Sequence, residues 1–139
     1  MSLSPSAIAL LGLVAWTLFL ALLLLNQRGL LVLSGRMQVN AFAPDGSNTP
    51  SAFGQRVVRA HANSLENLPM QAAVLLYAMQ AGQTAITDPL ACVLLGARIG
   101  QSLIHLISTS PLFVWLRFAG WLVQLAVLAW WLVRLAGLA

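Results

Sequence analysis

The run from Ile8 to Leu25 contains no charged residue and only one hydroxyl-bearing side chain, that of Thr17. An α-helix needs about 20 predominantly apolar residues to cross the hydrocarbon core of a bilayer. Together with its flanking residues the run is long enough for such a span, and no basic region followed by a small-residue cleavage site marks it as a signal peptide. We therefore expect it to remain in the mature protein as a transmembrane helix.

Four dipeptides along the chain combine a helix-capping side chain with a proline, and each precedes a long apolar stretch: Ser4-Pro5, Thr49-Pro50, Asp88-Pro89 and Ser110-Pro111. They predict helices at about residues 5–33, 52–81, 89–107 and 111–135. A chain of 139 residues, 60% of them hydrophobic and only 7% charged, has room for four spans and no separate soluble domain. The sequence therefore predicts an all-α fold that forms a single domain over residues 1–139, an integral membrane four-helix bundle. Because the second and third connections are short, we expect up-down topology.

The first connection, residues 37–51, is rich in polar and turn-forming residues that cannot lie in hydrocarbon. Most of the arginines flank this connection or the third one: Arg28, Arg36, Arg56, Arg59 and Arg117. By the positive-inside rule these two connections face the cytoplasm, and both termini lie on the opposite side. We expect an integral protein of the bacterial inner membrane. The net charge of +4 gathers at this end, and nothing in its pattern indicates nucleic-acid binding.

Residues 56–69, RVVRAHANSLENLP, place ionisable side chains inside the second predicted helix. Such a group costs on the order of 3 kcal/mol in a bilayer unless it is paired or hydrated, so the cluster indicates a function or a buried contact. At about 100° per residue, four of its members fall within one arc of roughly 80°: Arg56, Arg59, Asn63 and Glu66. The third predicted helix carries a similar stripe of Arg98, Gln101 and His105. We expect the two stripes to meet.

Glu66 is the only carboxylate inside the predicted spans, whereas arginines lie on several of them. A cavity with surplus guanidinium groups beside amides and an imidazole favours a small, polyvalent acid as ligand, because arginine binds carboxylates in a bidentate way. A structural ion pair of Glu66 with Arg98 is a second interpretation, and it is compatible with ligand binding.

The remaining reactive side chains give fewer indications. His61 lies roughly 140° from Arg56 on the helical wheel, which favours a packing or subunit contact over the polar face. Haem ligation by His61 and His105 is disfavoured, since the two stripes do not aim both imidazoles at one iron. Cys92 is the only cysteine, so the sequence holds no intrachain disulfide and no metal-binding spacing, and we expect a buried, inert thiol.

Residues 59–67, RAHANSLEN, resemble the R-A-x-x-N-x-x-E signature of the MAPEG family, the membrane-associated proteins in eicosanoid and glutathione metabolism. The family includes microsomal glutathione transferases. The resemblance extends to the four helices, the longer first loop and the basic residues gathered near that loop. It implies a homotrimer whose glutathione sites lie between adjacent subunits near the cytoplasmic face.

The resemblance also implies roles for single residues. Arg59, Asn63 and Glu66 are similar to the family's glutathione contacts on the second helix, and Arg98 is similar to the third-helix arginine that organises Glu66. The other glutathione-site positions fall on Arg36, His61, Gln101 and His105. Arg117 resembles the arginine that stabilises the glutathione thiolate, and it is the implied catalytic residue. Two departures leave catalytic competence open: His105 replaces a common tyrosine, and Phe118 stands where some relatives carry a serine.

The expected function is therefore that of a glutathione-dependent membrane transferase or peroxidase. Glutathione is the co-substrate, and its activated thiolate attacks a lipophilic electrophile or hydroperoxide dissolved in membrane lipid. A non-catalytic trimer of the same fold that binds lipid or another ligand is one alternative. A small four-helix transporter is another, although that class needs a carboxylate in the first helix, where this sequence has none.

Overall fold

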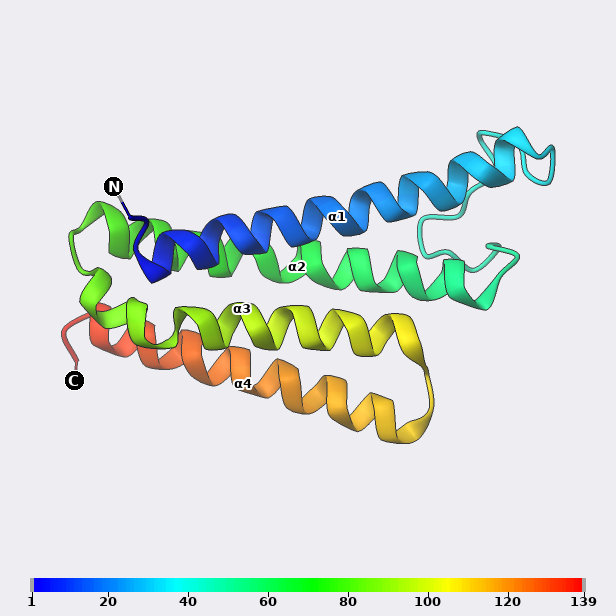
Figure 1. Ribbon diagram of the computed structural model, residues 1–139. Helices are drawn as coiled ribbons and strands as arrows, with labels where there is room; N and C mark the ends of the chain where they lie inside the picture. Colours follow the sequence, from blue (N-terminus) through cyan, green and yellow to red (C-terminus); the bar gives the residue numbers. More distant parts are fainter. Residues whose placement is uncertain (1, 139) are drawn as a thin grey trace.

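A computed structural model describes residues 2–138. Its four helices are α1 (Pro5–Leu33), α2 (Ala52–Gln80), α3 (Thr84–Ile107) and α4 (Pro111–Leu135). They run alternately in opposite directions, so that both termini and the α2–α3 connection lie at one end of the bundle (Figure 1). The long α1–α2 connection and the short α3–α4 connection lie at the other end. The predicted all-α, four-helix fold is confirmed.

Serine side chains cap the N-termini of two of the helices. The Ser4 hydroxyl accepts a hydrogen bond from the Ala7 N–H (3.2 Å) at the start of α1, as its pairing with Pro5 predicts. The cap of α2 is Ser51, whose hydroxyl accepts from the Gly54 N–H (3.0 Å), so the cap lies two residues beyond the predicted Thr49. Each cap satisfies one of the backbone donors that a helix start leaves without an intrahelical partner.

The predicted start of the third helix at Pro89 is wrong, because α3 begins at Thr84. Asp88 acts as a cap, but for a different helix. Its Oδ1 accepts hydrogen bonds from the N–H (2.9 Å) and the hydroxyl (2.6 Å) of Ser6 in the first turn of α1. Asp88 and Pro89 therefore lie inside α3, and the carboxylate joins α3 to α1 at the end of the bundle that holds the termini.

The bundle has an apolar half and a polar half. α1 packs against α2 and α3, and α4 packs mainly against α3. A cluster of buried apolar side chains fills the half nearer the termini and includes Leu13, Leu75, Leu94 and Trp131. The polar half comprises the middle of the bundle and the helix ends beside the first and third connections. Most of the buried polar side chains lie in the middle: Ser64, Asn67, Gln71, Arg98, Gln101, Ser102 and Gln124.

Three of the helices, α1, α3 and α4, are long and apolar enough to cross a membrane. α2 is as long as α1 (29 residues), but its polar cluster keeps its hydropathy below that of a span. Composition thus supports three of the four predicted spans. Large apolar side chains are exposed along the outer faces of α1 and α4, as contact with lipid requires. Cys92 is also exposed on α3, so the prediction of a buried thiol is wrong.

The first connection is held by its own side chains. Asn48 accepts a hydrogen bond from the Ala43 N–H (2.9 Å) and donates one to the Ala41 carbonyl. Asp45 accepts from the Ser47 N–H (3.0 Å), and this hydrogen bond to the charged carboxylate lowers the pKa of Asp45 below its ordinary value. The connection is therefore a series of turns placed over the ends of α1 and α2.

Candidate functional site

Arg98 is the centre of the polar half. It lies on α3 with 1% of its surface exposed, and it donates hydrogen bonds to three other side chains. Its Nε donates to Gln124 Oε1 (2.8 Å) on α4, and its Nη2 donates to Gln101 Oε1 (2.8 Å). Its Nη1 donates to both the main-chain oxygen (3.1 Å) and Oδ1 (2.8 Å) of Asn63 on α2. One guanidinium thus joins three helices, and the two predicted polar stripes meet at Arg98 and Asn63.

The ion pair that the sequence suggested between Glu66 and Arg98 is not formed. Each of the Arg98 partners is a neutral amide or carbonyl oxygen, and Glu66 is exposed on α2. The reason is that Asn63, one turn before Glu66, already supplies two acceptors to the same nitrogen of Arg98. Within the described chain, the carboxylate faces outward instead.

Two buried glutamines, neither of them among the predicted site residues, complete the network. Gln124 Nε2 donates to Gln101 Oε1 (2.9 Å) and to the Gly120 carbonyl (2.8 Å). Gln71 Nε2 donates to Gln124 Oε1 (2.9 Å), and both glutamines are 1% exposed. Gln124 is an isolated amide in an apolar stretch, so no polar stripe reveals it, whereas Gln71 follows Asn63 and Asn67 at intervals of four residues along one side of α2. The available signal was an amide inside a span, because such groups face the bundle interior, where partners exist.

His105 and Arg117 form a second polar contact nearer the α3–α4 connection. Arg117 Nη1 lies 3.1 Å from His105 Nδ1, and both side chains are partly buried. A guanidinium has donors and no acceptor, so Nδ1 must accept the hydrogen bond. The imidazole in this contact is therefore neutral, with its proton on Nε2. The structure joins the implied catalytic arginine to a histidine of the neighbouring helix.

The other predicted residues lie on the surface of the single chain. Arg36, Arg59 and Glu66 are exposed, and His61 is partly buried on α2. Arg59 lines a cavity of about 300 Å³ together with Arg56, Gln55 and Thr109. Arg56 has a structural role there, since its Nε donates to the Leu106 carbonyl (2.8 Å) in the last turn of α3. The fold thus gathers Asn63, Arg98 and Gln101 directly, and it leaves Arg36, Arg59 and Glu66 at the edge of the protomer.

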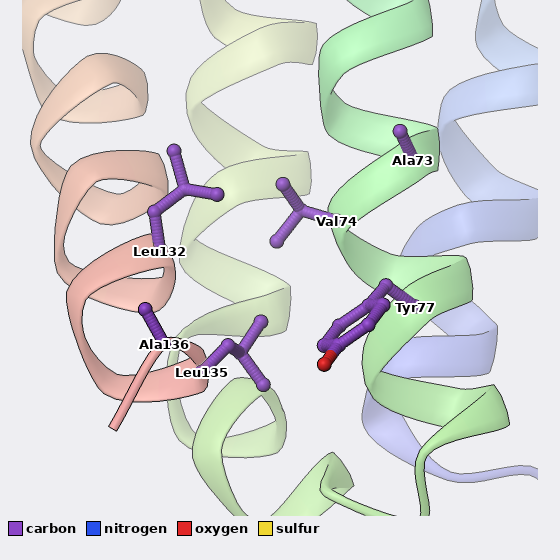
Figure 2. Close-up of a pocket in the computed structure, with 6 residues that line it drawn as sticks. All are labelled: Ala73, Val74, Tyr77, Leu132, Leu135 and Ala136. Carbon is purple, nitrogen blue, oxygen red and sulfur yellow. The ribbon is translucent and has the colours of Figure 1, made fainter. Parts of the chain in front are cut away.

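An apolar groove lies between α2 and α4 in the other half of the bundle (Figure 2). Leu132, Leu135 and Ala136 face Ala73, Val74 and Tyr77 across a cavity of about 370 Å³. The groove contains none of the predicted site residues. Among residues 2–138, no group of three histidine, cysteine or acidic side chains is arranged to hold a metal ion.

The chain was compared with models of known protein families, with curated proteins and with solved structures. The model of the MAPEG family matches residues 6–137 of the chain, a range that includes nearly all of the four helices and every residue of the two polar contacts. No curated protein and no solved structure matches the chain significantly.

Proposed function

Because the chain belongs to the MAPEG family, the membrane proteins of eicosanoid and glutathione metabolism, we propose that it is a glutathione-dependent transferase or peroxidase. Its co-substrate is glutathione, and its second substrate is a lipophilic electrophile or hydroperoxide that reaches the site through membrane lipid. The observation that supports this proposal best is the contact of Arg117 with neutral His105, because it orients a guanidinium that no carboxylate of residues 2–138 pairs with.

Binding follows from the surplus of positive charge in the polar half. Glutathione carries two carboxylates, and arginine side chains bind carboxylates through paired N–H donors. We assign this role to Arg36 and Arg59, with Asn63 supplying a neutral donor. Arg98 supports Asn63 from inside the bundle.

The site is completed by a second subunit in this proposal. Arg59 and Glu66 are exposed on α2. If α2 crosses the membrane beside the other three helices, as this proposal requires, an ionised side chain facing lipid costs on the order of 3 kcal/mol. A neighbouring subunit that covers this face of α2 removes that cost. We therefore propose a homotrimer, with His61 at the subunit contact and glutathione between adjacent protomers.

The chemistry is activation of a thiol. A guanidinium close to the glutathione sulfur favours the thiolate and lowers the pKa of the thiol. In conjugation, the thiolate sulfur forms a bond to an electrophilic carbon, and the leaving group departs with the bonding electrons. In peroxide reduction, the thiolate sulfur attacks the terminal oxygen, the O–O bond breaks, and the alkoxide takes up a proton and leaves as the alcohol. The thiol of a second glutathione then displaces water from the resulting sulfenic acid, which gives glutathione disulfide. Arg117 acts on the sulfur in both reactions, and His105 holds Arg117 in place.

The proposal is tested with protein purified in detergent. Glutathione binding is measured by calorimetry, and turnover of an aryl halide and of a lipid hydroperoxide is measured on the same preparation. We expect saturable glutathione binding and turnover of at least one of the two substrates. Arg134→Leu is the matched control, because Arg134 lies at the opposite end of the bundle and stacks on Trp130 (5.6 Å). Binding without turnover would favour the non-catalytic alternative, and absence of both would refute the proposal.

A further inference from the structure

We propose that Gln124 is a positioning residue of the glutathione site. It holds the guanidinium of Arg98, and through Arg98 it fixes the direction in which Asn63 presents its side-chain amide to the ligand. The inference rests on the proposed function, and it concerns a residue that is 1% exposed and therefore cannot touch the ligand itself.

The direction of every hydrogen bond in the network is set by Arg98. A guanidinium only donates, so the atoms that face it in Asn63, Gln101 and Gln124 must be oxygens. The orientation of three amide groups, which is otherwise ambiguous by a half-turn, is thereby determined. Gln124 Nε2 then points away from Arg98, toward Gln101 Oε1 (2.9 Å) and the Gly120 carbonyl (2.8 Å).

The consequence for the ligand lies at Asn63. Its Oδ1 is occupied by Arg98, so its Nδ2 group turns away from the guanidinium as a pair of donors. Asn63 is partly buried and belongs to the polar stripe of α2 that includes Arg59 and Glu66. Carboxylates and carbonyls of a bound peptide accept hydrogen bonds, so donors are what this position must present.

Gln124 is the part of the network that keeps Arg98 in this position. It supplies the acceptor for Arg98 Nε and ties the guanidinium to α4, whereas the other Arg98 partners lie on α2 and α3. Gln71 supports Gln124 from the opposite side, and this bond is the only one its amide makes, since Gln71 Oε1 is buried without a partner. Without Gln124, Arg98 Nε would lose its hydrogen-bond acceptor. The guanidinium could then move, and its contact with Asn63 would change.

The experiment compares Gln124→Leu, Gln124→Asn and Gln124→Glu by calorimetry with glutathione and by steady-state kinetics. Gln124→Leu should raise the dissociation constant and the KM for glutathione about tenfold or more. This is the loss expected when Asn63 no longer donates a hydrogen bond to a charged group of the ligand. The kcat should change much less, because Arg117 is not part of the network. Gln124→Asn is too short to reach Arg98 and should raise KM in the same direction with a smaller risk of misfolding. Gln124→Glu keeps the acceptor for Arg98 but loses the two hydrogen bonds that Gln124 Nε2 donates to Gln101 and Gly120, so it should raise KM less than Gln124→Leu does.

The matched control is Thr87→Val, which removes a fully buried hydroxyl group in the apolar half. The Thr87 hydroxyl oxygen lies 2.6 Å from that of Ser6. It should leave KM unchanged. A double-mutant cycle adds Asn63→Ala: if Gln124 acts through Asn63, the double variant should bind glutathione no more weakly than Asn63→Ala alone.

Additive losses in that cycle, unchanged KM in both Gln124→Leu and Gln124→Asn, or equal losses in Gln124→Glu and Gln124→Leu would each overturn the inference. A wild-type protein that does not bind glutathione would refute the proposed function itself. The two failures are therefore distinguishable.

Discussion

Replacement of Arg98 by methionine tests whether this arginine is held by amides or by a carboxylate. Removing one partner of a buried ion pair strands a charge and costs about 3–5 kcal/mol. In the network described above, Arg98→Met strands no charge. Gln124 Oε1 keeps the bond from Gln71, Gln101 Oε1 keeps the bond from Gln124, and the Asn63 carbonyl keeps the bond from the Asn67 amide.

Only Asn63 Oδ1 loses its partner, at a cost of about 1–3 kcal/mol, and the removal of a buried charge offsets part of it. For a chain of this size the melting temperature should fall by roughly 3–10 °C. The assay is thermal unfolding in detergent, followed by tryptophan fluorescence, for Arg98→Met, Glu66→Gln and the double variant. We expect Glu66→Gln to leave the melting temperature within about 2 °C of wild type, as for an exposed residue. A fall much larger than this range in Arg98→Met, restored by adding Glu66→Gln, would show that the two side chains do pair and would refute the reasoning.

Three further predictions concern the site and the first connection. Arg117→Leu should bind glutathione within about one order of magnitude of wild type but lose the ultraviolet absorbance of the thiolate and most conjugating activity, because one nearby charge shifts a pKa by a unit or more; normal absorbance and turnover would transfer the role to another residue. Native mass spectrometry should show a trimer, and monomers alone would contradict the proposed interface. The pKa of Asp45, followed by NMR, should lie below the ordinary 3.8 and return toward it in Ser47→Pro, which lacks the donating N–H. Since the folded pKa is lowered, this contact stabilises the turn above the ordinary pKa and is lost as the pH falls through the lowered value, which limited proteolysis of the connection should detect.

Periodicity predicted which residues share a face, and this part of the site was accessible from the sequence. Asn63 and Arg98 belong to the two stripes, and they form a direct contact of 2.8 Å. The helical wheel gives an angle around each helix axis, but it does not give the length of a side chain or show which of two neighbouring side chains forms a given contact. Asn63 and Glu66 lie in one arc, but the shorter side chain of Asn63 contacts Arg98 and the carboxylate of Glu66 is exposed. Partner choice is a property of the packed bundle.

The error at Asp88-Pro89 and the missed glutamines have the same origin. Asp88-Pro89 has the local chemistry of a helix start, yet the carboxylate is used by Ser6, which is 82 residues away in the chain. Gln124 stands alone among apolar residues, and its role follows from the packing of α4 against the other helices, which brings its Oε1 within 2.9 Å of Gln71 Nε2. Local patterns therefore located the helices and the polar faces, and tertiary contacts decided which polar groups form pairs.

The choice of amides rather than a carboxylate around Arg98 has an electrostatic consequence for the whole polar half. A carboxylate partner would cancel the field of the guanidinium, whereas neutral oxygens satisfy its donors and leave its charge in place. In surroundings of low dielectric, an uncancelled charge acts over a longer distance than it does in water. Arg98 and Arg117 then both favour the thiolate form of a bound ligand. Gln124→Glu should therefore keep Arg98 beside Asn63 while weakening the thiolate signal more than Gln124→Leu does, so that the effects of geometry and of charge can be measured separately.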